Sequence, residues 1–187
     1  MRNLFYMESI TQKDLRDACA ALHEEAEKTQ LAQDLIAGNM DPARYSNYCY
    51  QLYLIADMIE SQIVMADDLY RRYSLVRDIA LGPSVDVKAC PSTIDYVSYL
   101  SRQYDPQKNG QYKGHIYTHY LGWLYGGQMI SKNLTLPKHH LRFNNVKACV
   151  DHVRNDLLGL VFDRDADEAK LAFTYTIRIY QELYELH

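Results

Sequence analysis

The chain has 187 residues, enough for one domain of ordinary size, and we expect a single domain over residues 1–187. Twenty Lys and Arg against twenty-four Asp and Glu give a net charge of -4, which argues against broad binding to nucleic acid, because such binding requires a basic surface. Hydrophobic residues make up 48% of the chain and charged residues 24%, as in globular rather than disordered proteins.

The four cysteines are widely spaced and include no Cys-x-x-Cys pair, and no charged leader with an apolar core precedes them. We therefore expect a reducing, cytoplasmic location in which the cysteines are buried as small hydrophobic residues. Residues 114–131 carry no charged side chain, but their histidines, tyrosines and glycines favour a buried helix over a membrane span. No hydrophobic tail follows the last predicted helix, so we expect no membrane anchor.

Apolar residues recur at helical spacing and nothing alternates like a set of strands, which predicts an all-α fold. Thr11 and Asp14 form a capping box that begins the first helix. Its apolar face consists of Leu15, Cys19, Leu22, His23 and Ala26. Asp41-Pro42 begins the second, since Pro is favoured at the first helical position. Its apolar stripe consists of Tyr45, Cys49, Leu52, Ala56, Ile59 and Ile63.

Further along the chain, Ser92 with Asp95 predicts the start of another helix. Its apolar residues are Ile94, Val97 and Leu100. Three more helices are expected over about residues 111–132, 143–158 and 165–186. The stripe of the last helix consists of Ala169, Phe173, Thr176, Tyr180 and Leu183.

His23 is the first candidate for a functional residue, because its spacing places a polar ring on the apolar face of the first helix. One interpretation is a buried histidine that is hydrogen-bonded to a backbone carbonyl. The other is an axial ligand to a metal centre, since a neutral imidazole in an apolar pocket suits haem iron.

The segment Gly122-Trp123-Leu124-Tyr125-Gly126-Gly127-Gln128 lies within a predicted helix, where each glycine costs about 1 kcal/mol relative to Ala. Gly122 and Gly126 are four residues apart and therefore share a face. One interpretation is a close crossing with another helix. The alternative is that a flat ligand lies against the bare face.

His115 and His119 have the i, i+4 spacing of a metal-binding pair. The Glu-x-x-His pattern of di-iron bundles and the His-Glu-x-x-His pattern of zinc proteases are both missing. We therefore expect a solvated or packing role for at least one of the two. His139 and His140 follow Pro137 and are expected in a surface loop. Walker-type phosphate loops and Gly-x-Ser-x-Gly elbows are also missing.

Together these features resemble the haem oxygenase family. The central match runs from His115 to Gln128, H-I-Y-T-H-Y-L-G-W-L-Y-G-G-Q, against a family pattern close to H-x-Y-T-R-Y-L-G-D-L-S-G-G-Q. Residues 15–27 resemble the family's proximal helix, in which a histidine binds haem iron, and residues 168–183 resemble its closing helix. The resemblance covers nearly the whole chain in the expected order.

The resemblance implies an all-α domain with haem between a proximal and a distal helix. Haem would be both cofactor and substrate, and with O2 and external electrons it would be cleaved to biliverdin, carbon monoxide and ferrous iron. His23 would be the iron ligand, and Gly122 and Gly126 would form the distal wall. Arg16 and Arg154 would bind the haem propionates, for which the bidentate guanidinium is suited, unless they belong to solvated helix faces. The remaining pocket walls would be Tyr117 and Phe173.

Three positions depart from the family pattern. The family's distal Asp is Trp123 here, the Arg four residues earlier is His119, and a Lys that often precedes the propionate Arg by one turn is Val150. In the family that Asp acts through ordered water to steer protonation of the reacting oxygen. An indole N–H donates a hydrogen bond but cannot relay a proton.

Three explanations for these departures remain open. His119 takes over as the polar anchor of the water and titrates near neutral pH, or backbone carbonyls around Gly122 hold the water, or the protein binds haem as a carrier or sensor without degrading it productively. We expect an active enzyme in which His119, Trp123, Gly122 and Gly126 are the catalytic positions. A helical interaction domain that binds no haem is the alternative from a different class.

Turnover requires an external electron donor, because the chain has no flavin or nicotinamide site of its own. The resemblance points to ferredoxin, and a bilin reductase would be the downstream partner. An acidic ferredoxin needs a basic patch near the haem edge. The candidates for this patch are Lys13, Arg16, Arg142, Lys147 and Arg154.

Overall fold

The computed structural model describes residues 9–103 and 112–185. In chain order the elements are β1 (Ser9–Ile10), α1 (Gln12–Lys28), α2 (Gln30–Ala37), α3 (Pro42–Glu60), η1 (Asp67–Leu69), α4 (Arg72–Leu81), α5 (Pro91–Gln103), α6 (Lys113–Asn133), η2 (His139–Leu141), α7 (Val146–His152), η3 (Val153–Leu158), β2 (Val161–Phe162) and α8 (Asp163–Glu185). Eight of these described elements are α-helices, which confirms the all-α prediction. The described strands are two residues each and form one antiparallel pair.

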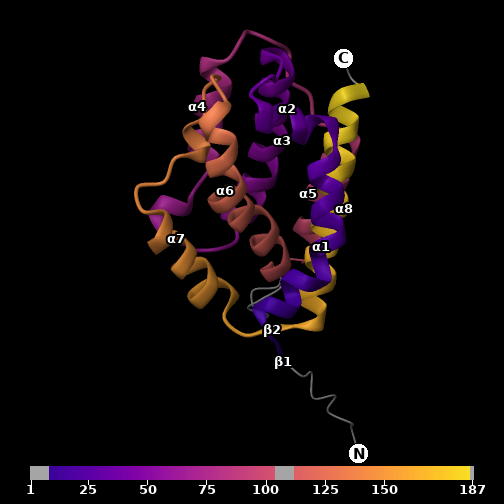
Figure 1. Cartoon of the computed structure of the whole chain (residues 1–187), viewed down its shortest axis with the longest axis vertical. Helices are drawn as coiled ribbons and strands as arrows, with labels where there is room; N and C mark the ends of the chain where they lie inside the picture. Colours follow the sequence, from indigo (N-terminus) through magenta and orange to yellow (C-terminus); the bar gives the residue numbers. More distant parts are fainter. Residues whose placement is uncertain (1–8, 104–111, 186–187) are drawn as a thin grey trace, which may run out of the picture.

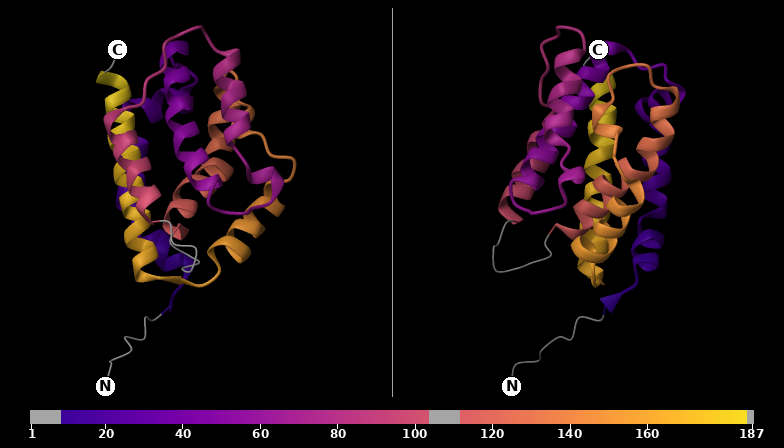
Figure 2. Two further views of the ribbon diagram at one scale, coloured as in Figure 1. Left: turned by 180° about the vertical axis from the view of Figure 1, so that it is seen from behind. Right: turned by 90° about the vertical axis from the view of Figure 1, so that its left-hand side faces the viewer.

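The helices pack as a bundle in which α1 lies along α8 and α6 crosses the middle (Figure 1). Viewed from behind, α3, α4 and α5 cover the other side of α6 (Figure 2). The pair β1–β2 joins the start of α1 to the start of α8 at one end of the bundle. None of the described helices is both long enough and apolar enough to span a membrane. Residues 114–131 lie within α6, in which ten residues are buried.

The first two predicted helix starts are confirmed. The Thr11 hydroxyl accepts from the Asp14 N–H at 3.1 Å, and the Asp14 carboxylate accepts from the Thr11 N–H at 2.8 Å. Asp41 caps α3 by accepting from the N–H of Arg44 at 2.8 Å, with Pro42 at the first helical position.

The predicted start at Ser92 is wrong, because α5 already begins at Pro91. The Ser92 N–H donates to the Glu182 carboxylate at 3.0 Å, and its hydroxyl donates to the same carboxylate. A side chain from α8 therefore satisfies the first turn of α5, where the sequence suggested a local cap by Asp95.

Two short helices, α2 and α4, were not predicted from the sequence. The Thr29 hydroxyl caps α2, and Gly38 ends it with a φ of 75°, a left-handed conformation that glycine adopts without strain. The helix expected over 143–158 begins at Val146 and continues from residue 153 as a π-helical segment. The other two expected helices match α6 and α8 within two residues in the described part of the chain, while residues 111 and 186 lie outside it.

The predicted apolar stripes form most of the core. All four cysteines are buried and free, as expected for a reduced protein. Ile63 lies beyond the end of α3 at Glu60 but packs, partly buried, against the core. Ile94 is an exception, since it is 55% exposed on α5. His23 is another, since its ring is exposed rather than packed with Leu15 and Cys19 in the core.

Candidate active site

A cavity of about 700 Å³ lies between α1 and α6, with further walls from α2, α3, α8 and η3. This volume is within the ~300–1,000 Å³ range of pockets that hold small molecules and cofactors. The cavity brings together every site residue predicted from the sequence: Arg16, His23, Tyr117, His119, Gly122, Trp123, Gly126, Arg154 and Phe173. Residues separated by more than a hundred positions in the chain therefore meet at one site.

His23 projects from α1 into this cavity. Its side chain is 57% exposed, so the interpretation as a buried histidine bonded to a backbone carbonyl is wrong. Nδ1 lies 3.7 Å from a carboxylate oxygen of Glu27, one turn further along α1. The edge of the Phe173 ring packs against the imidazole, with ring centroids 5.7 Å apart. The imidazole is thus oriented by two neighbours and remains accessible from the cavity.

The glycines of α6 serve two different purposes. A Cβ atom built on Gly122 or Gly126 would have no other atom within 4 Å, so neither glycine supports a helix crossing. Close packing occurs instead at Gly114, where a Cβ would collide with the backbone of α8, and at Gly127, where it would lie 2.9 Å from Leu141. The bare face at Gly122 and Gly126 is therefore cavity wall, as expected if a flat ligand lies against it.

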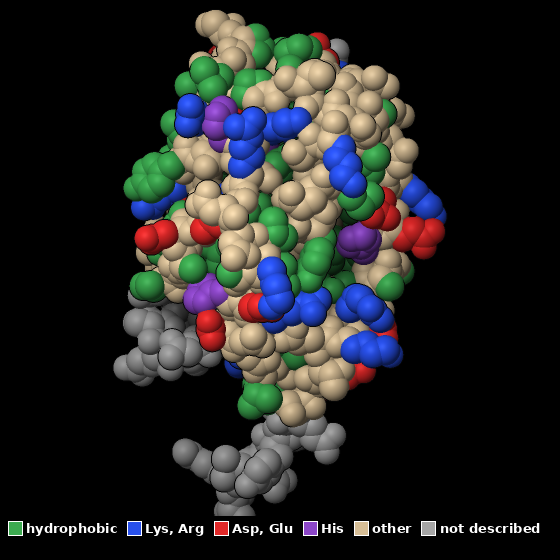
Figure 3. Space-filling model, turned by 60° about the vertical axis from the view of Figure 1, so that its left-hand side comes forward, with side chains coloured by type: hydrophobic (Ala, Val, Ile, Leu, Met, Phe, Trp, Pro, Cys, Tyr) green, Lys and Arg blue, Asp and Glu red, His purple; other side chains and the backbone are tan. Residues whose placement is uncertain are grey.

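Basic side chains line the edge of the cavity. Arg16 is 68% exposed and pairs with Asp17 at 3.1 Å, an exposed ion pair that contributes little to stability. The Arg154 guanidinium lies 5.8 Å from the Tyr125 ring centre. Lys13 is a third basic residue in the lining. The face drawn in Figure 3 shows Lys and Arg side chains gathered below central hydrophobic side chains.

Trp123 is buried in the wall formed by α6. Its indole packs edge-on against the Tyr120 ring, with centroids 4.9 Å apart, and lies 6.1 Å from the His119 ring. The Tyr120 hydroxyl in turn donates to the Glu60 carboxylate at 3.0 Å. Trp123, which stands at the family's Asp position, is thus held by packing against Tyr120 and has His119 as a polar neighbour.

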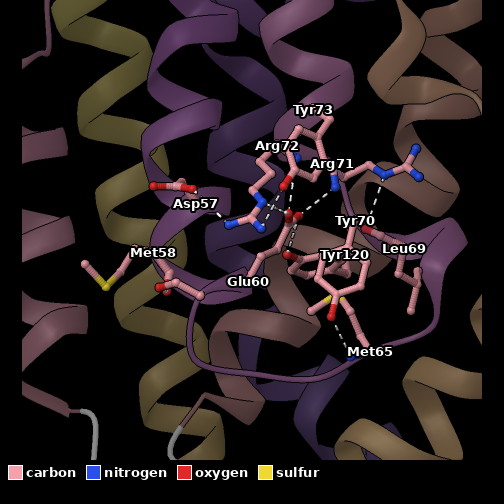
Figure 4. A network of polar contacts seen from close by, with 11 residues as sticks. Asp57, Met58, Glu60, Met65, Leu69, Tyr70, Arg71, Arg72, Tyr73 and Tyr120 are labelled. Atoms are coloured by element: carbon pink, nitrogen blue, oxygen red, sulfur yellow. Dashed lines mark hydrogen bonds and ion pairs between the residues drawn. The ribbon is translucent and has the colours of Figure 1, made fainter.

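Glu60 is the centre of a buried network behind this wall (Figure 4). Its carboxylate accepts from the N–H of Arg71 at 2.6 Å and from the N–H of Arg72 at 3.2 Å, where α4 begins. Burial raises the pKa of Glu60 and outweighs these hydrogen bonds, which favour the charged form. The network ties the end of α3, the start of α4 and, through Tyr120, the middle of α6 into one support for Trp123.

His119 and His115 are both buried and both contact the Tyr96 hydroxyl, at 3.0 Å from Nε2 of His119 and at 2.7 Å from Nδ1 of His115. His115 Nε2 lies 2.9 Å from the Glu168 carboxylate, which also accepts from the Tyr99 hydroxyl at 2.7 Å. Burial, helped by the nearby His115, lowers the pKa of His119 to about 3. The expectation that His119 titrates near neutral pH is therefore wrong, because a charged imidazole is disfavoured at this buried position.

Sequence reasoning missed Tyr96 and Glu168, because no local motif links them to the histidines. It was also wrong about His139 and His140. His140 is fully buried. The Asp78 carboxylate accepts from the backbone N–H of His139 at 2.7 Å and from that of His140 at 2.9 Å. Each Nδ1 atom also lies within 2.7 Å of that carboxylate. The short helix η2 aims these donors at a buried acid, which the loop composition does not reveal.

Among the described residues, no group of three or more His, Cys, Asp and Glu side chains is arranged to hold a bare metal ion. His115 and His119, which have metal-binding spacing, are instead hydrogen-bonded to other side chains: both to Tyr96, and His115 also to Glu168. Its histidines therefore have hydrogen-bonding roles.

Comparison with known proteins agrees with this geometry. The family model for heme oxygenase matches residues 10–182. Heme oxygenase 1 of Bos taurus is 27% identical over 205 residues, which cover 90% of this chain and 70% of the relative. Heme oxygenase of Porphyra purpurea is 23% identical over 210 residues, which cover 95% and 88%.

Two solved structures share the fold. Heme oxygenase-1 from the cyanobacterium Synechocystis, solved in complex with heme, aligns with a TM-score of 0.79 at 20% identity, over 93% of this chain and 92% of the other. The heme oxygenase of Leptospira interrogans aligns with a TM-score of 0.78 at 18% identity, over 91% and 98%. Because the family model matches nearly the full length, this chain belongs to the haem oxygenase family.

Proposed function

We propose that this protein binds haem in the cavity between α1 and α6 and, with O2 and external electrons, cleaves it to biliverdin, carbon monoxide and ferrous iron. The observation that carries the proposal is the composition of the cavity wall: an exposed histidine comes from α1, and a glycine face with no neighbouring atom comes from α6. A flat macrocycle with one accessible axial position fits such a site.

The residues present fit haem at each part of the molecule. Phe173 and Tyr117 offer aromatic walls for the apolar ring. The Arg16 and Arg154 guanidinium groups lie at the cavity edge, where they can hold the two propionates bidentately. His23 is the residue that would bind the iron. Haem itself, when bound, supplies the iron at which O2 is reduced and the carbon framework that is opened.

We assign the iron-binding atom as Nε2 of His23. Nδ1 lies 3.7 Å from the Glu27 carboxylate, beyond hydrogen-bond distance but close enough for the carboxylate to favour a proton on Nδ1 electrostatically. A carboxylate behind a ligating histidine fixes the tautomer and increases the basicity of the ligand nitrogen. Glu27 is therefore a positioning residue for His23.

On the distal side, Gly122 and Gly126 permit the backbone of α6 to approach the ring closely. Trp123 can only donate a hydrogen bond, since an indole has no acceptor nitrogen. His119 lines the cavity and is neutral over the physiological pH range, because burial lowers its pKa to about 3. Its imidazole can therefore accept one hydrogen bond while donating another, so we assign it the polar role that the resemblance gives to the family's Asp.

Electrons must arrive from a separate protein. Lys13, Arg16 and Arg154 line one cavity edge, which suits docking of an acidic one-electron carrier such as ferredoxin. Arg142 and Lys147 are further exposed basic residues for this surface. If this patch guides the encounter, the reduction rate falls steeply as ionic strength rises.

The test is an aerobic absorbance series on the haem-loaded protein with a ferredoxin reducing system. Wild type is expected to lose its Soret band while biliverdin absorbance grows. His23→Ala is expected to lose the wild-type Soret spectrum and its turnover. Glu27→Gln, which leaves the ligand in place, is expected to shift the spectrum and keep haem bound.

Two outcomes would contradict the proposal. A Soret band that depends on His23 but persists under reduction, without biliverdin, would make the protein a haem carrier or sensor. If added haem produces no Soret band at all, the protein is a helical interaction domain.

A further inference from the structure

We propose that Glu168, His115 and Tyr96 form a proton relay from the protein surface to His119 in the cavity wall, a role that rests on the proposed function. Degradation of haem with O2 consumes protons, and the family's distal Asp is absent at Trp123. The relay supplies a route built from side chains of α5, α6 and α8.

The relay is continuous at hydrogen-bond distance. Glu168 is 27% exposed and lies 2.9 Å from Nε2 of His115, whose side chain is fully buried. Nδ1 of His115 lies 2.7 Å from the Tyr96 hydroxyl, and this oxygen lies 3.0 Å from Nε2 of His119. His119 lines the cavity. One end of the line thus contacts solvent and the other contacts the ligand site.

The hydrogen bonds have a consistent direction. With Glu168 ionised, His115 donates from Nε2 and accepts at Nδ1 from the Tyr96 hydroxyl. The Tyr96 oxygen then accepts from Nε2–H of His119. Nδ1 of His119 is left as an acceptor, and within residues 9–103 and 112–185 the structure gives it no protein partner. A water or ligand atom in the cavity can complete this bond.

One proton can be delivered with every atom balanced, starting with Glu168 protonated and every hydrogen bond pointing toward the cavity. His119 releases the proton on Nδ1 and receives one on Nε2 from Tyr96. His115 reprotonates Tyr96 from Nδ1 and takes the proton of Glu168 at Nε2. Glu168 ends as a carboxylate and both imidazoles end as Nε2–H tautomers, which is the resting arrangement. A second delivery requires solvent to reprotonate Glu168 and both rings to reorient. No histidine carries a charge in this sequence.

The charges along the line set the resting direction of its hydrogen bonds, and a delivery begins when solvent protonates Glu168. Burial holds the pKa of His119 at about 3, so it does not retain an extra proton. Burial alone would raise the pKa of Glu168, but the hydrogen bonds from His115 and Tyr99 outweigh it and keep the pKa below its ordinary value. The resting relay therefore ends in a carboxylate that draws the chain of donors toward it.

The experiment compares Tyr96→Phe with a matched control, Tyr175→Phe. The Tyr175 ring stacks on Tyr96 with centroids 4.7 Å apart, but the relay runs through the Tyr96 hydroxyl and not through that of Tyr175. We expect the haem-loaded Tyr96→Phe protein to keep a normal Soret band and to form biliverdin about 10- to 100-fold more slowly, within the range of general acid–base effects. Tyr175→Phe is expected within about twofold of wild type. A small weak acid, added at constant pH and ionic strength, should partly restore the rate of Tyr96→Phe, which a packing defect would not allow.

A second readout uses the haem-free full chain. Nitrogen NMR of its histidines should show both His115 and His119 as Nε2–H tautomers in wild type and in Tyr175→Phe, and a tautomer mixture in Tyr96→Phe. If Tyr96→Phe fails to fold, Glu168→Gln replaces it, with the same expected loss of rate because the amide cannot supply the proton.

Equal rates of biliverdin formation in Tyr96→Phe and Tyr175→Phe would overturn the relay and leave the proposed function standing. The same holds if the histidine tautomers of Tyr96→Phe are those of wild type. A wild-type protein that binds haem and forms no biliverdin would overturn both. A slow Tyr96→Phe protein that weak acid does not rescue would make Tyr96 a structural residue only.

Discussion

The buried imidazole of His119 makes the stability of this fold sensitive to acid. Burial holds its pKa at about 3 in the folded chain, against an ordinary value of 6.5. Between these values the unfolded chain binds a proton that the folded chain does not, so the free energy of unfolding falls as pH drops below 6.5. A pH of about 5 lies about 1.5 units below the pKa of His119 in the unfolded chain. At about 1.36 kcal/mol per unit, protonation of His119 in the unfolded chain therefore lowers the free energy of unfolding by about 2 kcal/mol.

The assay is urea unfolding of the haem-free chain at about pH 7 and about pH 5, with His119→Gln as the test variant. The decrease in unfolding free energy between the two pH values is expected to be about 2 kcal/mol smaller in His119→Gln than in wild type. His152→Gln, which removes a histidine near the surface, is the control and should keep the wild-type decrease. The contribution of other histidines cancels in this comparison. An equal decrease in wild type and His119→Gln would mean that protons reach the folded imidazole freely, and the burial argument would be refuted.

Four further substitutions test the packing of the fold and of the cavity wall. Gly126→Ala should raise the unfolding free energy by about 1 kcal/mol, because alanine favours the helix and its Cβ meets open space. Gly114→Ala should lower it by about 1–3 kcal/mol, because its Cβ collides with the backbone of α8. Thermal melts of the two variants test both expectations. Gly126→Leu should prevent haem binding while the fold remains, so a Soret titration that matches wild type would show that haem does not lie against this face. Asp78→Asn should lower the unfolding free energy by about 2–4 kcal/mol in urea, because a buried carboxylate that accepts from two backbone N–H groups is replaced by an amide with one acceptor oxygen.

The sequence predicted those parts of the fold that depend on local chemistry. The caps at Thr11 and Asp41 are bonds between residues three apart, so their pattern is visible in the chain. The start of α5 could not be predicted in this way, because the group that satisfies it is Glu182, ninety residues further on. Helix α4 was missed for the same reason, since its first N–H groups donate to Glu60 from the preceding helix.

The cavity lining was predictable because the residues that carry it belong to recognisable segments. Glycines in the interior of a helix have an energetic cost, so Gly122 and Gly126 stand out in the amino-acid sequence itself. The hydrogen-bonded partners do not stand out in this way. Glu168 meets His115 across 53 residues of sequence, and Asp78 meets His140 across 62. Ordinary polar residues on helix faces are usually solvated, so only the packing of the helices identifies these as buried acceptors.

Helix α6 accounts for how the proposed haem-facing wall can persist without the family's distal carboxylate. Residues 115, 119, 122 and 126 share one face of α6; along it, His115 and His119 contact Tyr96 of α5, and Gly122 and Gly126 line the cavity. Next to Gly122, Trp123 packs against Tyr120 and contributes no acceptor. The polar group nearest to it is the ring one turn earlier, which has its own line of donors and acceptors to the surface. Under the proposed function, an indole in place of the carboxylate therefore moves the acceptor by one helical turn, to His119. That shift requires a neutral imidazole at position 119, and its burial beside His115 provides one.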